Sequence, residues 1–164
     1  MKCRRMLIPS QETSQPWIYA DGKGEGCYED GQTYVGKWLV FVSHEHVDEV
    51  WERMRSAVEA GKLGISAKVS TSRPSGYKST DHVICVYTYD FRDKADVGRV
   101  LTALRDIGIT GRLYYKTDQA TLSGVYAREG PFTKKKQRAS LYASDDFEQQ
   151  CTGKRISGLT RTCT

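Results

Sequence analysis

Apolar positions along the chain repeat with two periods, that of a strand and that of a helix. Residues 37–43 (KWLVFVS) form a continuous apolar run, which is typical of a buried strand. Residues 65–71 (ISAKVST) and 111–116 (GRLYYK) alternate apolar and polar positions, as half-buried strands do. Residues 82–88 (HVICVYT) are rich in β-branched side chains and predict a central strand. A last short strand is expected at residues 122–127.

Two amphipathic helices are predicted between these strands. Apolar residues recur at helical spacing over residues 47–60, and Gly61 is expected to end that helix. Asp93 is expected to be the N-cap of the second helix, with the Asp96 carboxylate near the positive end of the helix dipole. Gly108 is expected to end this helix. The order strand, helix, strand, strand, helix, strand, strand predicts an α+β fold in which helices pack on one face of an antiparallel sheet.

The remaining segments predict loops and a tail around one domain. Residues 18–36 are rich in glycine and aspartate and are expected to form a loop. The hydrophobic period ends near residue 128. We therefore expect a flexible N-terminus at residues 1–15, a single α+β domain at 16–127, and a basic tail at 128–164 that is poorly ordered or loosely packed.

Charge and cysteine content narrow the class of protein. The formal net charge is +5. Residues 128–164 account for most of it, with eight basic and four acidic side chains. The remainder is nearly neutral, which disfavours a broad duplex-binding surface. The five cysteines include no C-x-x-C pair, so we expect free thiols in a reducing, cytoplasmic location and no metal site. No apolar run approaches the length of a membrane span.

The alternating strands predict a polar sheet face opposite the helices. The helices would bury Ile65, Ala67, Val69, Leu113 and Tyr115. The far face would then hold Ser66, Lys68, Ser70, Arg112, Tyr114 and Lys116. Ammonium and guanidinium groups beside hydroxyls bind phosphate or carboxylate, and Arg73 and Lys78 in the adjacent loop could reach the same ligand. The alternative is a solvated face with no ligand, and a slip of one residue in register would invert the assignment.

The histidines offer weaker candidates for chemistry. His82 opens a strand beside the loop that holds Arg73 and Lys78, so it is the best general-acid candidate; the alternative is a surface histidine without chemistry. His44 and His46 form an H-x-H pair between a strand and a helix. Without a third ligand at suitable spacing, we expect them to cap this junction rather than to bind a metal.

Four segments of the chain carry a resemblance: residues 36–41 (GKWLVF), 64–71 (GISAKVST), 82–91 (HVICVYTYDF) and 111–118 (GRLYYKTD). Together they resemble the basophilic-leukaemia-expressed protein family. That family is similar in fold to translation initiation factor 4E, the mRNA cap-binding protein. The resemblance covers roughly residues 16–126 and implies a curved antiparallel sheet backed by helices.

The resemblance implies a nucleotide or RNA ligand without implying cap recognition. A cap-binding factor stacks the base between two tryptophans, and a glutamate follows the second one. Trp17 resembles the second tryptophan, but Ile18 follows it, and no tryptophan precedes it in the chain. Arg73 and Lys78 resemble the phosphate-binding loop positions.

Some relatives are also labelled, by similarity, as phosphothreonine lyases. Such an enzyme uses a lysine to take an α-proton, an acid to protonate the leaving phosphate, and arginines to hold it. On that resemblance Lys68 and His82 would be catalytic, Arg112 and Arg73 would hold the phosphate, and Lys116 would assist.

The leading hypothesis is a binding module for a phosphate-bearing ligand, either a nucleotide or single-stranded RNA. The charge would come from Lys68, Arg73, Lys78, Arg112 and Lys116, and the stacking surface from Trp17, Tyr77 and Tyr114, with Ser66 and Ser70 lining the site. The alternatives are a lyase that eliminates phosphate and a protein–protein adaptor. No cofactor and no membrane partner are expected, and the basic tail is a candidate contact for a protein partner.

Overall fold

The computed structural model of the chain describes residues 6–23, 34–75, 79–122 and 140–151. Within them, six strands form one antiparallel sheet: β1 (Trp17–Asp21), β2 (Gly36–Val42), β3 (Ser66–Ser70), β4 (His82–Thr88), β5 (Tyr114–Thr117) and β6 (Tyr142–Ala143). The helices are α1 (Val47–Glu59), α2 (Lys94–Asp106), α3 (Asp118–Leu122) and α4 (Asp145–Cys151). The strand order is β1-β3-β4-β2-β5-β6, so the chain crosses the sheet repeatedly.

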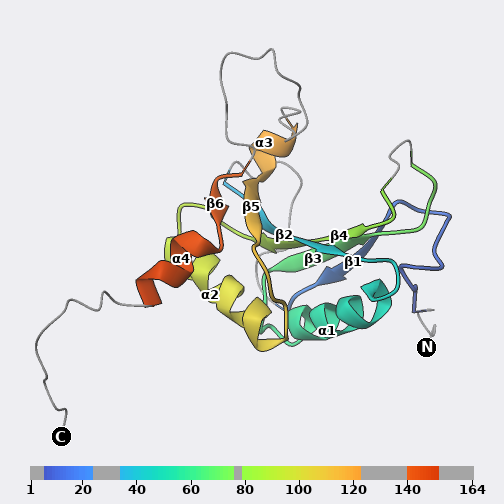
Figure 1. Cartoon of the computed structure of the whole chain (residues 1–164), viewed down its shortest axis with the longest axis horizontal. Helices are drawn as coiled ribbons and strands as arrows, with labels where there is room; N and C mark the ends of the chain where they lie inside the picture. The colour runs from blue at the N-terminus through green and yellow to red at the C-terminus, as the bar shows by residue number, and fades with distance from the viewer. Residues whose placement is uncertain (1–5, 24–33, 76–78, 123–139, 152–164) are drawn as a thin grey trace, which may run out of the picture.

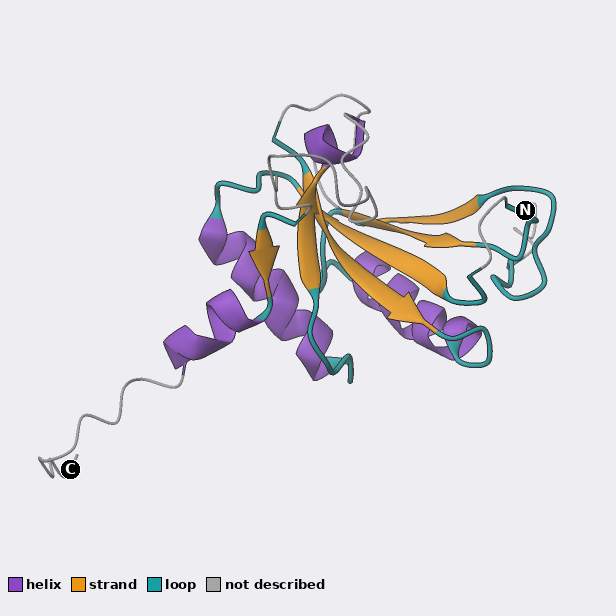
Figure 2. Cartoon of the chain, turned by 45° about the horizontal axis from the view of Figure 1, so that its top comes forward, coloured by secondary structure: helices purple, strands orange, loops and turns teal. Residues whose placement is uncertain are grey.

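The sheet is curved, and its two long helices pack on the same face. Figure 1 shows α1 and α2 below the sheet, with α4 beside α2 and α3 above the end of β5. Figure 2 shows the strands fanned out over this helical layer. The predicted α+β architecture is confirmed, and no helix among the described residues is long and apolar enough to cross a membrane.

Both long helices follow from the signals in the sequence. The apolar stripe of α1, with Trp51 and Met54 at its centre, is buried against the sheet. The Asp93 carboxylate accepts a hydrogen bond of 3.1 Å from the Asp96 N–H, which confirms the predicted N-cap of α2. Gly61 and Gly108 follow the two helices with φ of +73° and +91°, a backbone conformation that favours glycine.

The core lies between the sheet and the two helices. Trp38 of β2 is fully buried, and its Nε1–H donates to the carbonyl oxygen of Val97 in α2 at 3.1 Å. Its ring meets Tyr115 of β5 edge to face, at 5.2 Å between centroids. These contacts fix the helical layer against the centre of one face of the sheet.

The predicted loop over residues 18–36 is wrong at both ends. Trp17–Asp21 is a strand that pairs with β3, and Gly36 is the first residue of β2. Ile18 and Ala20 are buried in the core, so β1 follows the alternation of a half-buried edge strand. This strand has only two apolar inward positions, and glycines follow it closely, so the sequence pattern predicts a loop here instead of a strand. Residues 24–33 lie outside the described part of the chain.

The strand expected at residues 122–127 is also wrong in its described part. Residues 118–122 form the short helix α3, and residues 123–127 lie outside the described ranges. The Thr117 hydroxyl accepts a hydrogen bond of 3.1 Å from the Ala120 N–H, so it caps the turn that starts α3. This local cap redirects the chain out of β5.

Described residues of both expected terminal segments contact the sheet and helices. Residues 140–151 of the expected tail form β6 and α4, and Phe147 packs on Trp38 at 5.8 Å between ring centroids. At the N-terminal side, the Ser10 backbone N–H donates to Asp48 of α1 at 2.9 Å. In both places a few specific contacts attach a segment whose composition gave no hydrophobic period.

Ile65 is the one inward position of the alternating strands that lies elsewhere. Ala67, Val69, Leu113 and Tyr115 belong to the main core as predicted. Ile65 packs instead against a second cluster that contains Cys85 and Tyr87, on the other face of the sheet. It precedes the first residue of β3, so the alternation that holds from Ser66 onward does not extend to it.

Candidate ligand-binding face

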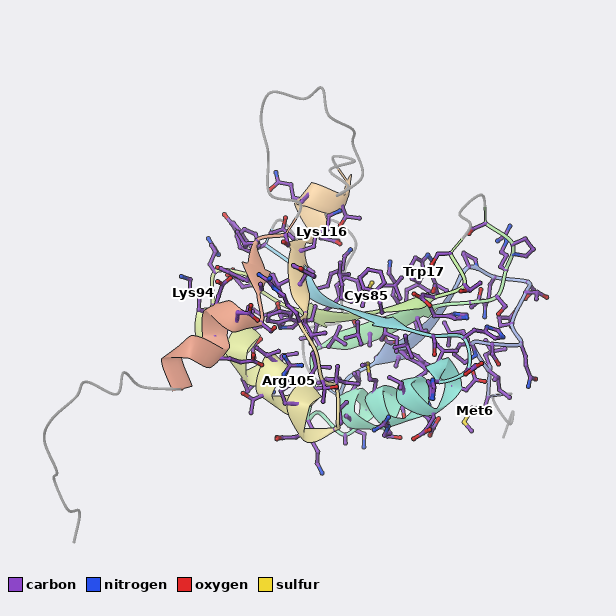
Figure 3. All side chains as sticks on the ribbon, viewed as in Figure 1. Met6, Trp17, Cys85, Lys94, Arg105 and Lys116 are labelled. Carbon is purple, nitrogen blue, oxygen red and sulfur yellow. The ribbon has the colours of Figure 1, made fainter. Side chains whose placement is uncertain are left out.

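We call the sheet face turned away from α1 and α2 the open face. Cross-strand pairing brings its side chains into rows that run across the strands. The central row is Tyr19, Lys68, Cys85, Leu39 and Tyr114, and the row beside it is Asp21, Ser66, Tyr87, Lys37 and Lys116. Figure 3 shows Trp17, Cys85 and Lys116 along this face, above the helical layer.

Lys68 and Trp17 come together on the open face. The Lys68 ammonium lies 4.3 Å from the centroid of the Trp17 ring and 5.7 Å from that of Tyr87. These are distances at which the negative face of an aromatic ring attracts a cation. Both Lys68 and Trp17 are half-buried, so a charge and a flat ring lie together at the surface of the described part of the chain.

A buried ion pair lies at the α3 side of the same face. The Lys37 ammonium donates to Asp118 Oδ1 at 2.7 Å, and the side chains are only 5% and 11% exposed. Lys37 also lies 5.2 Å from the centroid of the Tyr87 ring. Lys37 and Tyr87 were not predicted as site residues, because the apolar runs in β2 and β4 indicated burial on both faces. The signal that identifies them is their pairing with Lys116 and Ser66, which requires the strand order.

Burial and neighbouring charges shift the pKa values of two groups on the open face, Lys116 and Cys85. Burial lowers the pKa of Lys116, and the positive charge of Lys37 lowers it further. Burial raises the pKa of the Cys85 thiol, while the charges of Lys37 and Lys68 act in the opposite direction. An anion placed near these groups would favour the charged form of each lysine.

The predicted serines Ser66 and Ser70 belong to the open face, but both take part in packing or hydrogen bonding between strands. Ser66 is buried where it pairs with Tyr87. The Ser70 hydroxyl accepts a hydrogen bond of 2.9 Å from the Val83 N–H of β4. Ser70 therefore links two strands, and Ser66 is too buried to line an exposed site.

Arg112 lies apart from Lys68, since β5 and β3 are separated by two strands. Arg112 precedes β5, with its Nε 3.4 Å from Asp145 Oδ2 and its guanidinium 5.5 Å from the Tyr114 ring. Arg73 lies exposed in the loop after β3. Tyr114 is exposed on the open face, whereas Tyr77 and Lys78 lie outside the described residues. The structure thus places Lys68, Trp17, Tyr114 and Lys116 on one face, with Arg112 beside Tyr114 and apart from Lys68.

His82 is buried and does not face Lys68, which corrects the expectation of a surface histidine. Alternation along β4 places it on the side of Ile84, whereas Lys68 pairs with Cys85 on the open face. Its Nδ1 lies 2.8 Å from the Ser70 carbonyl oxygen, and its Nε2 lies 3.0 Å from His44 Nδ1. The ring therefore links β4 to β3 and to the end of β2, and Lys68 and His82 do not form an acid–base pair.

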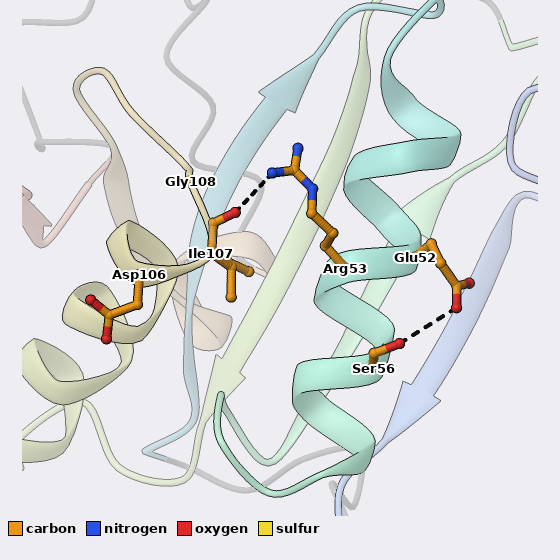
Figure 4. A pocket seen from close by; sticks show the side chains of 6 residues that line it. All are labelled: Glu52, Arg53, Ser56, Asp106, Ile107 and Gly108. Atoms are coloured by element: carbon orange, nitrogen blue, oxygen red, sulfur yellow. Dashed lines mark hydrogen bonds between the residues drawn. The ribbon is translucent and has the colours of Figure 1, made fainter.

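A groove on the helical side is separate from the open face. It lies between α1 and the end of α2, has a volume of ≈ 620 Å³, and is lined by Glu52, Arg53, Ser56, Asp106, Ile107 and Gly108. Figure 4 shows Arg53 reaching across it, where Nη1 donates to the Ile107 carbonyl oxygen at 2.9 Å. The groove is mainly a junction of two helices that one arginine bridges.

Comparison with known proteins identifies a family and a fold. The family model "Basophilic leukemia-expressed protein Bles03" matches residues 27–122, more than half of the chain. Among solved structures, a schistosome eIF4E complexed with m7GpppA and 4E-BP is 14% identical, with a TM-score of 0.56 over 85% of this chain and 75% of that one. A complex of C. elegans eIF4E-3 with the 4E-binding protein Mextli and cap analog is 16% identical, with a TM-score of 0.53 over 73% and 72% of the two chains. At these identities the structural likeness shows the fold, and it confirms the expected initiation factor 4E-like architecture.

Proposed function

We propose that this chain, which belongs to the basophilic leukemia-expressed protein Bles03 family, binds a phosphate-bearing ligand, a nucleotide or single-stranded RNA, on its open face. The observation that carries the proposal is the Lys68 ammonium 4.3 Å from the Trp17 ring centroid. An ammonium group binds phosphate as a point charge, and an aromatic ring beside it provides a surface on which a base can stack.

The electrostatics of the open face support an anionic ligand. Burial disfavours the charged form of Lys116 and lowers its pKa, and a nearby phosphate would favour the charged form again. Lys37 is already paired with Asp118, so it contributes less to the net field. Lys68 is half-buried beside the Trp17 ring, whereas Lys37 and Lys116 are buried, so we assign Lys68 to direct phosphate contact, with Lys116 acting through its charge.

The structural neighbours support a nucleotide as the class of ligand, but the residue after Trp17 does not support cap recognition. The schistosome structure contains m7GpppA and the C. elegans structure a cap analog. In this chain Ile18 follows Trp17 and is buried in the core, so it offers no carboxylate to a base on the open face. The proposal is therefore a nucleotide or RNA ligand, and not specific recognition of a methylated cap.

Fluorescence titration tests the proposal, because the three tryptophans differ in exposure. Trp38 and Trp51 are 0% and 2% exposed, whereas Trp17 is half-buried on the open face. Uridine monophosphate or a short oligouridylate should quench the emission of the wild-type protein, and Trp17→Phe should lose that signal. Lys68→Ala should weaken binding about tenfold, by loss of a charge-assisted contact.

Lys62→Ala is the matched control, because Lys62 is an exposed lysine in the turn after α1. It should leave the dissociation constant unchanged. Equal affinities of the wild-type and Lys68→Ala proteins, or no binding of any phosphate-bearing compound, would contradict the proposal.

A protein–protein adaptor is the second candidate, favoured by the groove between α1 and α2. Both neighbours described above were solved with a protein partner, 4E-BP or Mextli. The phosphate-eliminating lyase gains no support from the geometry, since Lys68 and His82 lie on opposite sides of the sheet. Incubation with a phosphothreonine peptide, with phosphate release measured, tests it directly. A cytoplasmic location and a protein contact through the basic tail stay predictions.

A further inference from the structure

Among the described residues, four aromatic side chains of the open face that are exposed or half-buried form two separate pairs. We call Trp17 and Tyr19 the β1 pair, since they are two residues apart on one side of β1. We call Phe41 and Tyr114 the β2–β5 pair. Tyr114 is the register partner of Leu39, so Phe41 is its diagonal neighbour across two strands. Tyr19, Phe41 and Tyr114 are 61%, 65% and 42% exposed, unlike the buried aromatics of the core.

The two pairs are too far apart to hold the same base. The nearest members, Trp17 on β1 and Phe41 on β2, lie three strand spacings apart, which is about 14 Å at ~4.8 Å per strand. Tyr19 and Tyr114, at the two ends of the central row, lie four spacings apart. Two rings that sandwich one base lie about 7–8 Å apart, twice the contact distance between carbon atoms. A mononucleotide can therefore contact one pair, but it cannot contact both.

The surface between the pairs suits a chain of linked nucleotides. Lys68 lies in the central row next to the β1 pair, where its ammonium can meet a phosphate. Val83 and Leu39 follow toward the β2–β5 pair and are half-buried apolar side chains. Aromatic rings that stack bases with little sequence preference, together with a cation for the backbone, are the combination that single-stranded nucleic-acid sites use.

We propose that the open face binds an extended single strand of nucleic acid that crosses the strands of the sheet, with one base at the β1 pair and a later base at the β2–β5 pair. This inference rests on the proposed function and specifies its ligand. It assigns Phe41 and Tyr114 to the recognition of a second base, at a distance that only a linked nucleotide can reach.

A length series of oligonucleotides tests the inference. The probes are uridine monophosphate, a dinucleotide, a tetranucleotide and an octanucleotide of uridine, with the deoxyribose series in parallel. Wild-type affinity should rise at least tenfold from the mononucleotide to the octanucleotide. Phe41→Ala and Tyr114→Ala should each weaken octanucleotide binding about fivefold or more, the expected loss for one stacked base. Neither variant should change the affinity for uridine monophosphate, which binds beside Lys68.

Met6→Ala is the matched control, because Met6 is as exposed as Phe41 but lies beside α1, away from the open face (Figure 3). It should leave every affinity unchanged, and circular dichroism confirms that each variant is folded. Length-dependent binding in either series supports the inference, and a preference for one sugar identifies the strand as RNA or DNA.

Two results would overturn the inference, and they have different meanings. If uridine monophosphate and the octanucleotide bind equally and Phe41→Ala has no effect, the extended strand is wrong while the proposed function stands. If no probe binds at all, both are wrong.

Discussion

Lys37 and Asp118 show how much a single buried charge pair matters at the edge of the open face. Their side chains are almost entirely buried, and the two residues come from β2 and the start of α3. A buried pair of this kind is costly to break, because the remaining charge stays in a poorly solvated place.

Asp118→Asn should therefore lower the free energy of unfolding by about 3–5 kcal/mol. Urea denaturation measures the change. Asp106→Asn, at an exposed position at the end of α2, should change it by less than about 0.5 kcal/mol. A loss of the same small size at Asp118 would show that solvent reaches the pair.

The alkylation rate of Cys85 should depend on pH, because its thiol is buried. The pKa of its thiol is raised by burial, so the thiol stays protonated to higher pH than an ordinary cysteine. The thiolate is the reactive form, and alkylation at about pH 8 should therefore be much slower in the native protein than in the unfolded chain. The rate should rise as the pH is raised toward the elevated pKa.

The measurement uses a protein in which Cys3, Cys27, Cys151 and Cys163 are replaced by serine, so that Cys85 alone reacts with iodoacetamide. The same protein in urea supplies the reference rate. Equal rates in the native and unfolded states at about pH 8 would contradict the buried position of Cys85.

Sequence alternation predicts single residues where one strand face is polar. It correctly places Lys68, Tyr114 and Lys116 together on the face opposite the helices. Alternation does not identify Lys37 and Tyr87 as open-face residues. In their strands the other open-face side chains are apolar, and several of them pack with Tyr87 as a second cluster. A strand that is apolar on both sides carries no alternation to detect.

At the scale of elements, β6 and α4 complete the sheet and its core. Phe147 of α4 meets Trp38 and Tyr142 edge to face, and its ring lies 3.0 Å from where a Cβ on Gly98 would be. Gly98 therefore leaves the space on α2 into which this ring fits. Only a few side chains of this segment pack, so its sequence has no hydrophobic period, and the sequence therefore predicts a tail that is poorly ordered or loosely packed.

Phe147→Ala should destabilise the protein by about 2 kcal/mol, less than for a fully buried phenylalanine because the ring is only partly buried. Thermal and urea unfolding measure the loss. The control is Glu148→Ala, which removes only a partly exposed ion pair with Arg105 and should cost less than about 1 kcal/mol. No difference between the two variants would mean that α4 contributes little to the fold.

For the whole molecule, the predicted order of elements was sufficient for the architecture but not for the site. Two helices on one face of an antiparallel sheet follow from period, caps and loop lengths. The strand order β1-β3-β4-β2-β5-β6 does not, because β1 was missed and because pairing of non-consecutive strands leaves no local signal. The rows of the open face depend on that order, and so does the distance between its two aromatic pairs.

The most direct test of the central claim is an amide chemical-shift map of the isotope-labelled protein titrated with the uridine octanucleotide. A ligand on the open face should perturb β1 and β3 around Trp17 and Lys68, and should leave the groove at Arg53 and Ile107 unchanged. Perturbations confined to that groove, or none at saturating oligonucleotide, would contradict the claim that this sheet face is the binding site.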